Sequence, residues 1–477
     1  MAFFNKSDLL LREAGKDKKP VSDDENVSFG ESDEEGFVLL ECNNDEVDEF
    51  ERDPWLESDH PLYFPSTQTN GPTQLSRWGA VDKFSVENWY SQLKKFTFAS
   101  QFFSLDSKDI QFLMGNAPQD YDITKLERAF NLILTQFKNN EAFMRLSTRS
   151  PKDSQSLFDE AAVLMSNDFI YWNETDNKNQ QLVSFVASIT QAMKITNGRK
   201  IIETIQGSPR VYNDFIALLS LEQPNKTTKI VFREWYNIRP EHEFRVFVSR
   251  RCRTESIITA ISQYFHFLYF DKTSEDGSNF FNEESMKAIS LKFQEYVLKL
   301  IDPEVAHFLN FSNEQNDDDT INCIREYVID LALIPVNEYR GDVFEENQIR
   351  IGGNHYVITV IELNPFAPAA TGASLFNWKR DLDRLWGKEQ CDYPILCYRT
   401  EPRESFQSIS LLPTHYEQVI QNAVAKRMVA VEEPNQVKSL VLHSSINQTA
   451  RFFVPEAPKA QASINEETQN AIKDFAV

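Results

Sequence analysis

Residues 239–247 read Arg-Pro-Glu-His-Glu-Phe-Arg-Val-Phe, and this stretch decides how the rest of the chain is interpreted. Glu243 and Arg245 alternate with Phe244, so the predicted strand has one apolar face and one charged face. Antiparallel sheets often have such a face where they meet water. Arg233 lies close by in an otherwise acidic chain, and guanidinium groups suit phosphate oxygens. The stretch therefore indicates a nucleotide site on a sheet.

A second stretch, 356–364, is β-branched and apolar except near its end. Glu362 and Asn364 are two residues apart, so the pleat of a strand aims both oxygens at one face. Asp330 is the only charge in the second half of another apolar run, 324–334. Hard divalent cations prefer such oxygen ligands. The alternative is that Asp330 and Glu362 each form an ion pair with a nearby arginine, and the residues leave the two interpretations open.

These interpretations differ in one forecast. If Asp330 is a bare metal ligand, removing its charge relieves carboxylate repulsion and leaves the metal-free protein as stable as before. If it belongs to a buried ion pair, the same change strands the partner and is destabilising.

A third piece places Arg145 inside a short predicted strand, 142–147. The turn that follows, 148–153, contains small residues and Lys152. Turns rich in donors can cradle phosphates, but this one lacks the glycines of a phosphate-binding loop.

Taken in order, these segments resemble the cell division cycle protein 123 family, whose members have an ATP-grasp fold. The Arg-Pro-Glu-x-Glu-Phe-Arg core and the Asn-Pro-Phe ending are specific in combination. The resemblance runs from about residue 84 to about residue 378, through segments 89–90, 96–98, 143–153, 232–248, 261–264, 361–366 and 375–378.

The resemblance implies cofactors and ligands. It implies Mg²⁺ held by Asp330, Glu362 and Asn364. It implies ATP bound by Arg145, Lys152, Arg233, Trp235 and Arg245. The sequence departs from the family pattern at three of its positions. This chain has Glu362 where the family has Asp, Arg145 where it usually has Lys, and Thr148 where it usually has Trp. An arginine cannot replace a lysine atom for atom, so the second departure bears on nucleotide affinity.

The pattern of elements predicts an α+β protein, ATP-grasp-like, with a mostly antiparallel central sheet and flanking helices. Apolar residues at helical spacing predict helices from Asp122 to Phe137, over 181–195 and over 283–301. Strands are predicted over 229–235, 243–250, 256–264, 324–334 and 356–363.

Charge predicts the domain organisation. The first sixty residues carry 19 acids and 6 bases, so they hold −13 of the net charge of −23, and residues 21–50 contain no base. Such a segment buries too little apolar surface to order itself, so residues 1–75 are expected to be a disordered acidic arm. Residues 76–430 are expected to form the ATP-grasp-like module, with a helical part (76–225) and a sheet-rich part (226–400) that binds nucleotide and metal. Residues 431–477 are expected to be a flexible tail.

The acidic arm contains a short candidate motif. Phe37 precedes Leu40 by three residues, behind the acidic lead 32–35. It resembles the motif by which autophagy receptors add a strand to ubiquitin-like autophagy modifiers. Motifs this short also arise by chance.

Several classes of function are excluded. No basic stripe is present, so nucleic-acid binding is not expected. Apolar runs are too short for a membrane span, and the first residues do not form a secretory signal. Five scattered cysteines, with no Cys-x-x-Cys, fit a reducing compartment and argue against zinc. A cytoplasmic protein is expected.

Two functions are compatible with these features. The resemblance implies an ATP-dependent assembly chaperone for eukaryotic translation initiation factor 2 that binds its gamma subunit. The alternative is an active ATP-grasp ligase that joins a carboxylate or other anionic substrate to an acceptor through a phosphorylated intermediate. In that case Arg145, Arg149 and Lys152 would hold the second substrate.

Overall fold

The computed structural model describes the backbone of residues 38–41 and most of the chain between 84 and 425. The described ranges are 84–167, 177–220, 228–250, 256–270, 280–309, 326–366, 371–378, 380–388, 394–403, 417 and 419–425. The arm on either side of residues 38–41 and the tail 431–477 lie outside these residues, as does the acidic segment 310–320.

Helices and strands are interspersed along the chain. The helices are α2 (Val86–Leu93), α3 (Ser107–Leu113), α4 (Ile123–Leu134), α5 (Gln155–Ser166), α6 (Lys178–Ala192), α7 (Gly198–Gln206), α8 (Pro209–Ser220), α9 (Glu283–Tyr296), α10 (Asp302–Phe308) and α11 (Leu382–Leu385), with a π-helical turn η5 (Val297–Ile301) and 3₁₀ turns η3 (Lys138–Asn140), η4 (Pro240–His242) and η6 (Glu345–Asn347). The strands are β1 (Val38–Glu41), β2 (Ser100–Leu105), β3 (Ala142–Leu146), β4 (Lys194–Ile195), β5 (Thr228–Glu234), β6 (Glu243–Arg250), β7 (Ser256–Gln263), β8 (Glu326–Pro335), β9 (Gln348–Ile351), β10 (Asn354–Pro365) and β11 (Ile395–Tyr398).

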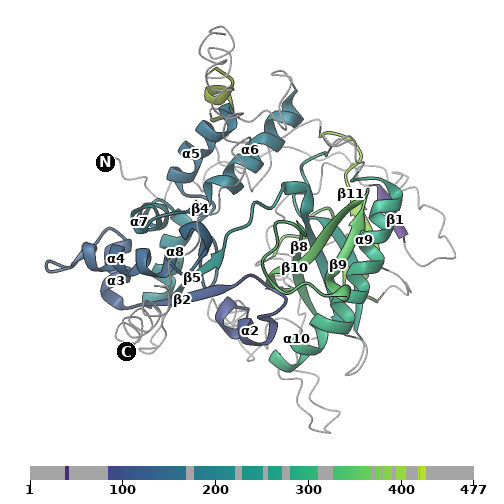
Figure 1. Cartoon of the computed structure of the whole chain (residues 1–477), viewed down its shortest axis with the longest axis horizontal. Coiled ribbons are helices and arrows are strands. Elements are labelled where there is room, and N and C mark those ends of the chain that lie inside the picture. The colour runs from purple at the N-terminus through teal and green to yellow at the C-terminus, as the bar shows by residue number, and fades with distance from the viewer. Residues whose placement is uncertain are drawn as a thin grey trace, which may run out of the picture.

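The strands form two sheets, one in each half of the molecule (Figure 1). The larger sheet has seven strands in the order β1-β11-β7-β6-β8-β10-β9. Its pairs are antiparallel from β7 to β9 and parallel where β11 joins β1 and β7. The smaller sheet has four strands in the order β2-β5-β3-β4, all antiparallel. Residues 235–242 connect β5 of one sheet to β6 of the other.

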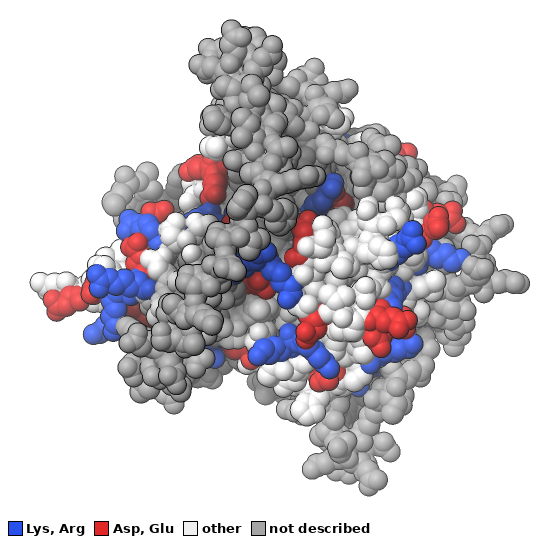
Figure 2. Space-filling model, in the orientation of Figure 1, with Lys and Arg blue, Asp and Glu red and all other residues white. Residues whose placement is uncertain are grey.

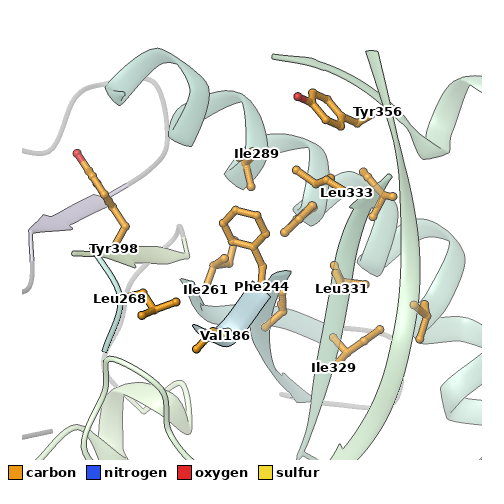
Figure 3. Close-up of a cluster of buried hydrophobic side chains, with 14 of the residues drawn as sticks. Val186, Phe244, Ile261, Leu268, Ile289, Ile329, Leu331, Leu333, Tyr356 and Tyr398 are labelled. Carbon is orange, nitrogen blue, oxygen red and sulfur yellow. The ribbon is translucent and has the colours of Figure 1, made fainter. Parts of the chain in front are cut away.

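One face of the larger sheet carries the main hydrophobic core. Phe244 on β6 and Leu331 on β8 are fully buried against Ile289 of helix α9 (Figure 3). Alternation along the strands sends Arg245 and Asp330 to the opposite face. That face is apolar at two places, around Val328 and around Ala332, and the charged residues lie between them.

The smaller sheet is built on the same principle. Phe232 on β5 and Met144 on β3 belong to a core shared with helices α4 and α7. Their strand neighbours Arg233 and Arg145 therefore lie on the other face, away from these helices. Both sheets thus present arginines or carboxylates on the face that does not carry their helix-backed core.

The structure confirms the predicted fold class, an α+β protein with a mostly antiparallel central sheet and flanking helices. The helix expected from Asp122 is α4, where the Asp122 carboxylate accepts hydrogen bonds from the amides of Thr124 (2.9 Å) and Lys125 (3.3 Å). All five predicted strands are present within three residues of their expected ends. The sequence did not predict β1, β9 and β11 of the larger sheet or β2 and β4 of the smaller one. Because β2, β3 and β4 lie in the part 76–225, that part contains sheet as well as helix.

The described residues contain no helix long and apolar enough to cross a membrane.

Strand β1 differs from the expectation for the acidic arm. Residues 38–41 lie within the segment 1–75, yet they pair in parallel with β11, from Val38 opposite Ile395 to Glu41 opposite Tyr398. They form the last strand on that side of the larger sheet. The charge argument for disorder averaged over the whole arm and missed the short apolar run Val-Leu-Leu, which suits an edge strand.

Two truncations should therefore behave differently. Deleting residues 1–37 should leave the midpoint of thermal unfolding within about 1 °C, because the charge of this acidic segment predicts that it adds little to the core. Deleting residues 1–75 also removes β1 and its backbone hydrogen bonds, each worth about 1 kcal/mol, and should lower the midpoint by about 2–6 °C. Differential scanning calorimetry of both proteins checks this, and equal midpoints would show that β1 adds nothing to the folded state.

Candidate functional site

The predicted site residues converge where the two sheets meet. Arg145 and Arg233 come from β3 and β5 of the smaller sheet, and Arg245, Asp330 and Glu362 come from three strands of the larger one. All five are largely or fully withdrawn from solvent, with Asp330 1% exposed and Arg233 1% exposed. On the face drawn in Figure 2, acidic and basic residues lie together along the middle of the molecule, while the right-hand half shows a broad uncharged area.

Three neighbouring strands of the larger sheet bring their charges into one row. Asp330 lies opposite Arg245 on one side and opposite Glu362 on the other. Arg245 binds Asp330 through two parallel hydrogen bonds, Nε to Oδ1 and Nη2 to Oδ2, both 2.8 Å. Its remaining nitrogen donates to the carbonyl of Gly372 (2.7 Å), and Asn364 Nδ2 donates to Asp330 Oδ2 (3.0 Å). The predicted metal ligands are therefore adjacent.

A β-bulge makes this row possible. Val360 on β10 lies opposite Leu331, and Glu362 lies opposite Asp330, so Ile361 is an extra residue without a partner on β8. Leu363 rejoins the apolar core on the far face, and Asn364 returns to the face of Glu362.

An ion pair crosses from one sheet to the other. Arg145 Nη1 donates to Glu362 Oε2, and the two side chains are 9% and 20% exposed. Arg145 also donates to the carbonyls of Leu146 (3.2 Å) and Thr148 (3.3 Å). Arg145 and Glu362 are two of the positions at which the sequence departs from the family pattern, and each carries the longer side chain of its chemical type. The two departures are thus direct partners.

Lys152 is brought to the same place by the turn after β3. Its Nζ lies 5.3 Å from the ring centre of Tyr264, and Arg245 Cζ lies 4.9 Å from that centre. The turn is fixed at Asp153, which accepts from Ser208 Oγ (2.5 Å) and from the amide of Arg210 (2.9 Å). Packing of the turn onto the start of helix α8 therefore aims Lys152 at the larger sheet.

Arg149 in the same turn is directed elsewhere. Its Nε lies 2.7 Å from Asp214 Oδ2 on helix α8, and Thr148 Oγ1 donates to the same oxygen (2.9 Å). The sequence grouped Arg149 with Arg145 and Lys152 as a site for a second anionic substrate, and the structure does not bring it to them.

Arg233 and Trp235, the other two residues expected to bind ATP, do not pair with the carboxylates of the charged row. Arg233 Nη1 donates to the carbonyl of Ile361, and Nη2 donates to Thr97 Oγ1 (2.5 Å), so its guanidinium is engaged by neutral oxygens. Trp235 is buried at the start of the connection between the sheets, where its carbonyl accepts from Arg340. Within the described part of the chain, no hydrogen bond joins Trp235 to the charged row.

Burial and neighbouring charges shift the titration of the cluster. Burial raises the pKa of Glu243 to about 7, although Lys152 opposes the shift. Burial acts in the same direction on Glu362, but the charges of Arg145 and Lys152 outweigh it and lower the pKa of Glu362 to about 2. Burial acts to lower the pKa of Lys152, and Tyr264 with the surrounding carboxylates raises it instead. At neutral pH Glu362 and Lys152 are therefore charged, and Glu243 is close to half protonated.

Glu243 should make stability depend on pH. Its folded pKa of about 7 lies above the unfolded value of 4.5, so the folded protein holds the proton more tightly and loses stability as pH rises through this window. Glu243→Gln cannot ionise, and at pH 8 it should be more stable than the unchanged protein by on the order of 1–3 kcal/mol. At pH 4.5 the difference should be small. Urea melts of both proteins at the two pH values test this, and a stability difference that does not change with pH would contradict it.

The residues present fit Mg²⁺ and the phosphates of ATP. Asp330, Glu362 and Asn364 offer adjacent carboxylate and amide oxygens, which hard cations prefer. Arg145 and Lys152 offer cations from the facing sheet and its turn. Among the described residues, no group of three His, Cys, Asp or Glu side chains is arranged to hold a metal ion. Such a site would thus rest on two carboxylates and one amide.

In the structure both carboxylates are paired with an arginine, which is the ion-pair alternative that the sequence left open. The sequence also did not assign Glu243, Tyr264 or Thr97 to the site. Glu243 alternates with Arg245 on one strand, and this signal was available. Thr97 and Tyr264 are ordinary strand or loop residues whose roles depend on contacts between distant segments.

One comparison with known proteins, the family profile, shows the family. The profile of the D123 family matches residues 183–441, which include Arg233, Arg245, Asp330, Glu362 and Asn364 but not Arg145 or Lys152. A solved structure of C-terminally truncated Cdc123 from Schizosaccharomyces pombe is 14% identical and covers 68% of this chain and 98% of that one, with a TM-score of 0.42. The corresponding structure titled Cdc123 from the same organism is 15% identical, with the same coverage and a TM-score of 0.40. No curated protein sequence matches the chain. The matching profile spans more than half of the length of this chain, and the chain therefore belongs to the D123 family, also called the Cdc123 family.

Proposed function

We propose that this protein binds ATP with Mg²⁺ between its two sheets and acts as an assembly chaperone for eukaryotic translation initiation factor 2. Membership of the Cdc123 family supports the chaperone role in general. The observation that carries the nucleotide proposal is the row Arg245, Asp330 and Glu362, faced across the sheets by Arg145 and Lys152.

Each residue has a role in this proposal. Asp330, Glu362 and Asn364 would hold Mg²⁺, which neutralises phosphate charge when bound. Lys152 and Arg145 would hold the phosphates. Arg145 is already occupied by Glu362, so it reaches a phosphate only by leaving that carboxylate. We therefore expect metal and nucleotide to bind together, because Glu362 would be free to hold a cation only when Arg145 turns from it to a phosphate.

The partner would be the gamma subunit of the factor. Arg145 and Glu362 tie the smaller sheet to the larger one, and an exchange of their partners on ATP binding would change how the two halves are held. We propose that this change orders the surface that grips the gamma subunit.

The test has two stages. Calorimetric titration of the full chain with ATP should show binding with Mg²⁺ and at least tenfold weaker binding without it. Capture of the purified gamma subunit should then be stronger with Mg²⁺ and ATP than without nucleotide. Absence of ATP binding would end the nucleotide proposal, and nucleotide-independent capture would separate the chaperone role from ATP.

The ligase alternative needs a second anionic substrate and turnover of ATP. Arg149, which the sequence offered for that substrate, is engaged by Asp214. Phosphate release from Mg-ATP, measured with and without added cell-extract metabolites, distinguishes the two functions. A ligase releases phosphate when its substrates are supplied, whereas a chaperone that only binds ATP releases none in either case.

The acidic arm supports a further partner, a ubiquitin-like autophagy modifier. Residues 38–41 take strand conformation, as strand addition requires, and among the described strands β1 has a neighbour on only one side. Phe37 lies outside the described residues. Replacing Phe37 and Leu40 by Ala should abolish capture of a purified modifier and leave Mg-ATP affinity unchanged. If the unmutated protein does not capture the modifier, the proposal fails.

A further inference from the structure

Arg233 is a buried cation held by neutral groups. Its side chain is 1% exposed, and its guanidinium lies 4.8 Å from the ring centre of Phe98 and 5.9 Å from that of Trp89. Its hydrogen bonds go to Thr97 Oγ1 and to the carbonyl of Ile361. Among the described residues it has no carboxylate within ion-pair distance, in contrast to Arg145 and Arg245.

The carbonyl that Arg233 binds belongs to the bulge. Ile361 is the extra residue between Val360, opposite Leu331, and Glu362, opposite Asp330. Strand β9 pairs with β10 only over Asn354 to Val357, so it does not reach the bulge.

A second segment pairs with β10 just before the bulge. The amide of Val360 donates to the carbonyl of Phe96 (2.8 Å), and Thr97 Oγ1 donates to the carbonyl of Val360 (2.7 Å). Thr97 therefore bonds both to the residue before the bulge and to Arg233, which bonds to the bulge residue itself. Arg233 and Thr97 together form a clamp on residues 360 and 361.

The position of the bulge decides which side chains face the site. With Ile361 as the extra residue, Glu362 lies beside Asp330 and Asn364 follows on the same face. If the bulge moved one residue along the strand, Ile361 would lie opposite Asp330 and Glu362 would be the unpaired residue. Leu363 and Asn364 would keep their partners Ile329 and Val328, so Glu362 is the oxygen ligand whose position the clamp determines.

We infer that Arg233 is a positioning residue: with Thr97 it fixes the bulge at Ile361, and it does not contact the phosphates of the nucleotide. This assignment rests on the proposed Mg-ATP site for its functional meaning. It replaces the expectation from family resemblance that Arg233 lies near the phosphates.

Hydrogen exchange in the nucleotide-free protein tests the clamp without any ligand. Thr97→Val and Arg233→Met should speed amide exchange of a peptide covering residues 360–364 at least about tenfold, because the bulge loses its donors. Thr97→Ser keeps the hydroxyl and should exchange like the unchanged protein. Arg340→Met is the control, since Arg340 also donates to a backbone carbonyl, that of Trp235, and pairs with Glu234, away from the bulge. Unchanged exchange over 360–364 in Thr97→Val would overturn the inference, even if Arg233→Met does not fold.

A double-mutant cycle with Glu362 distinguishes positioning from phosphate contact. If Thr97 and Arg233 act through Glu362, Thr97→Val should weaken Mg-ATP binding about tenfold alone and have almost no further effect in the Glu362→Gln background. If Arg233 touches phosphate, Arg233→Lys should weaken ATP binding by the same factor with either residue at 362, and this result would overturn the inference. If the unchanged protein binds no Mg-ATP, the proposed function fails, while the exchange experiment still decides whether the clamp exists.

Discussion

Replacing Asp330 by Asn should lower the free energy of unfolding of the nucleotide-free protein by about 3–5 kcal/mol, because it breaks a buried ion pair and strands a charged partner. The side chain of Asp330 is 1% exposed and that of Arg245 is 9% exposed, and two hydrogen bonds of 2.8 Å join them. The same change should weaken Mg-ATP binding at least tenfold, about 1.4 kcal/mol. A urea melt and a calorimetric titration measure the two effects.

Two controls make this result specific. Asp383→Asn breaks an exposed pair with Lys388, whose side chains are 66% and 54% exposed, and should change stability by less than about 1 kcal/mol. Replacing Asp330 by Leu together with Arg245 by Met removes both charges and should recover much of the lost stability without recovering nucleotide affinity. An Asp330→Asn protein as stable as the original would refute the ion pair.

If Asp330 were a bare metal ligand, removing its charge would leave the free energy of unfolding of the metal-free protein unchanged. The expected loss of stability corrects that forecast. The bidentate contact with Arg245 reverses that forecast, since the charge of Arg245 is balanced mainly by Asp330.

Exchanging the charges of Arg145 and Glu362 should restore stability but not nucleotide binding. Each single change, Arg145→Glu or Glu362→Arg, places like charges where the two sheets meet and should cost about 2–3 kcal/mol. This is less than for Asp330, because the side chain of Glu362 is 20% exposed. The double variant rebuilds an ion pair in the reverse sense and should recover about 1–2 kcal/mol. Mg-ATP affinity should stay at least tenfold reduced in all three, since position 362 no longer provides a metal ligand or position 145 a phosphate donor.

Denaturant melts of the four proteins give the coupling free energy between the two side chains. A coupling near zero would mean that the contact between the sheets is unimportant for folding. Mg-ATP binding by the exchanged protein with the original affinity would mean that neither side chain contacts the ligand.

The sequence predicted four of the seven strands of the larger sheet, β6, β7, β8 and β10, because these strands carry strong local signals. Alternation of Phe244 and Val246 with Glu243 and Arg245 predicts both the strand β6 and the charged face on which the site lies. Asp330 and Glu362 were found because an isolated acid in an apolar strand needs a partner.

Other features depend on contacts between distant segments and have no local signal. The bulge at Ile361 is defined by register against β8, by Arg233 from the smaller sheet and by Thr97 from the segment before β2, so no pattern around residue 361 indicates it. The choice of partner for Asp330, metal or arginine, follows from strand order, because Arg245 lies directly opposite. Strand β2 was missed because it is short and polar at three of its six positions, and its adjacent Phe102 and Phe103 obscure the alternation of Phe103 with Leu105.

The placement of a divalent cation tests the central claim most directly. Crystals of the protein grown with Mn²⁺ and a non-hydrolysable ATP analogue would reveal the metal by its anomalous scattering. We predict one peak within about 2–2.5 Å of oxygens of Asp330, Glu362 and Asn364, with Arg145 turned from Glu362 to a phosphate. A nucleotide bound elsewhere, or no metal peak at these oxygens with Arg145–Glu362 and Arg245–Asp330 both unchanged, would contradict the proposal that this row of charges is a nucleotide site.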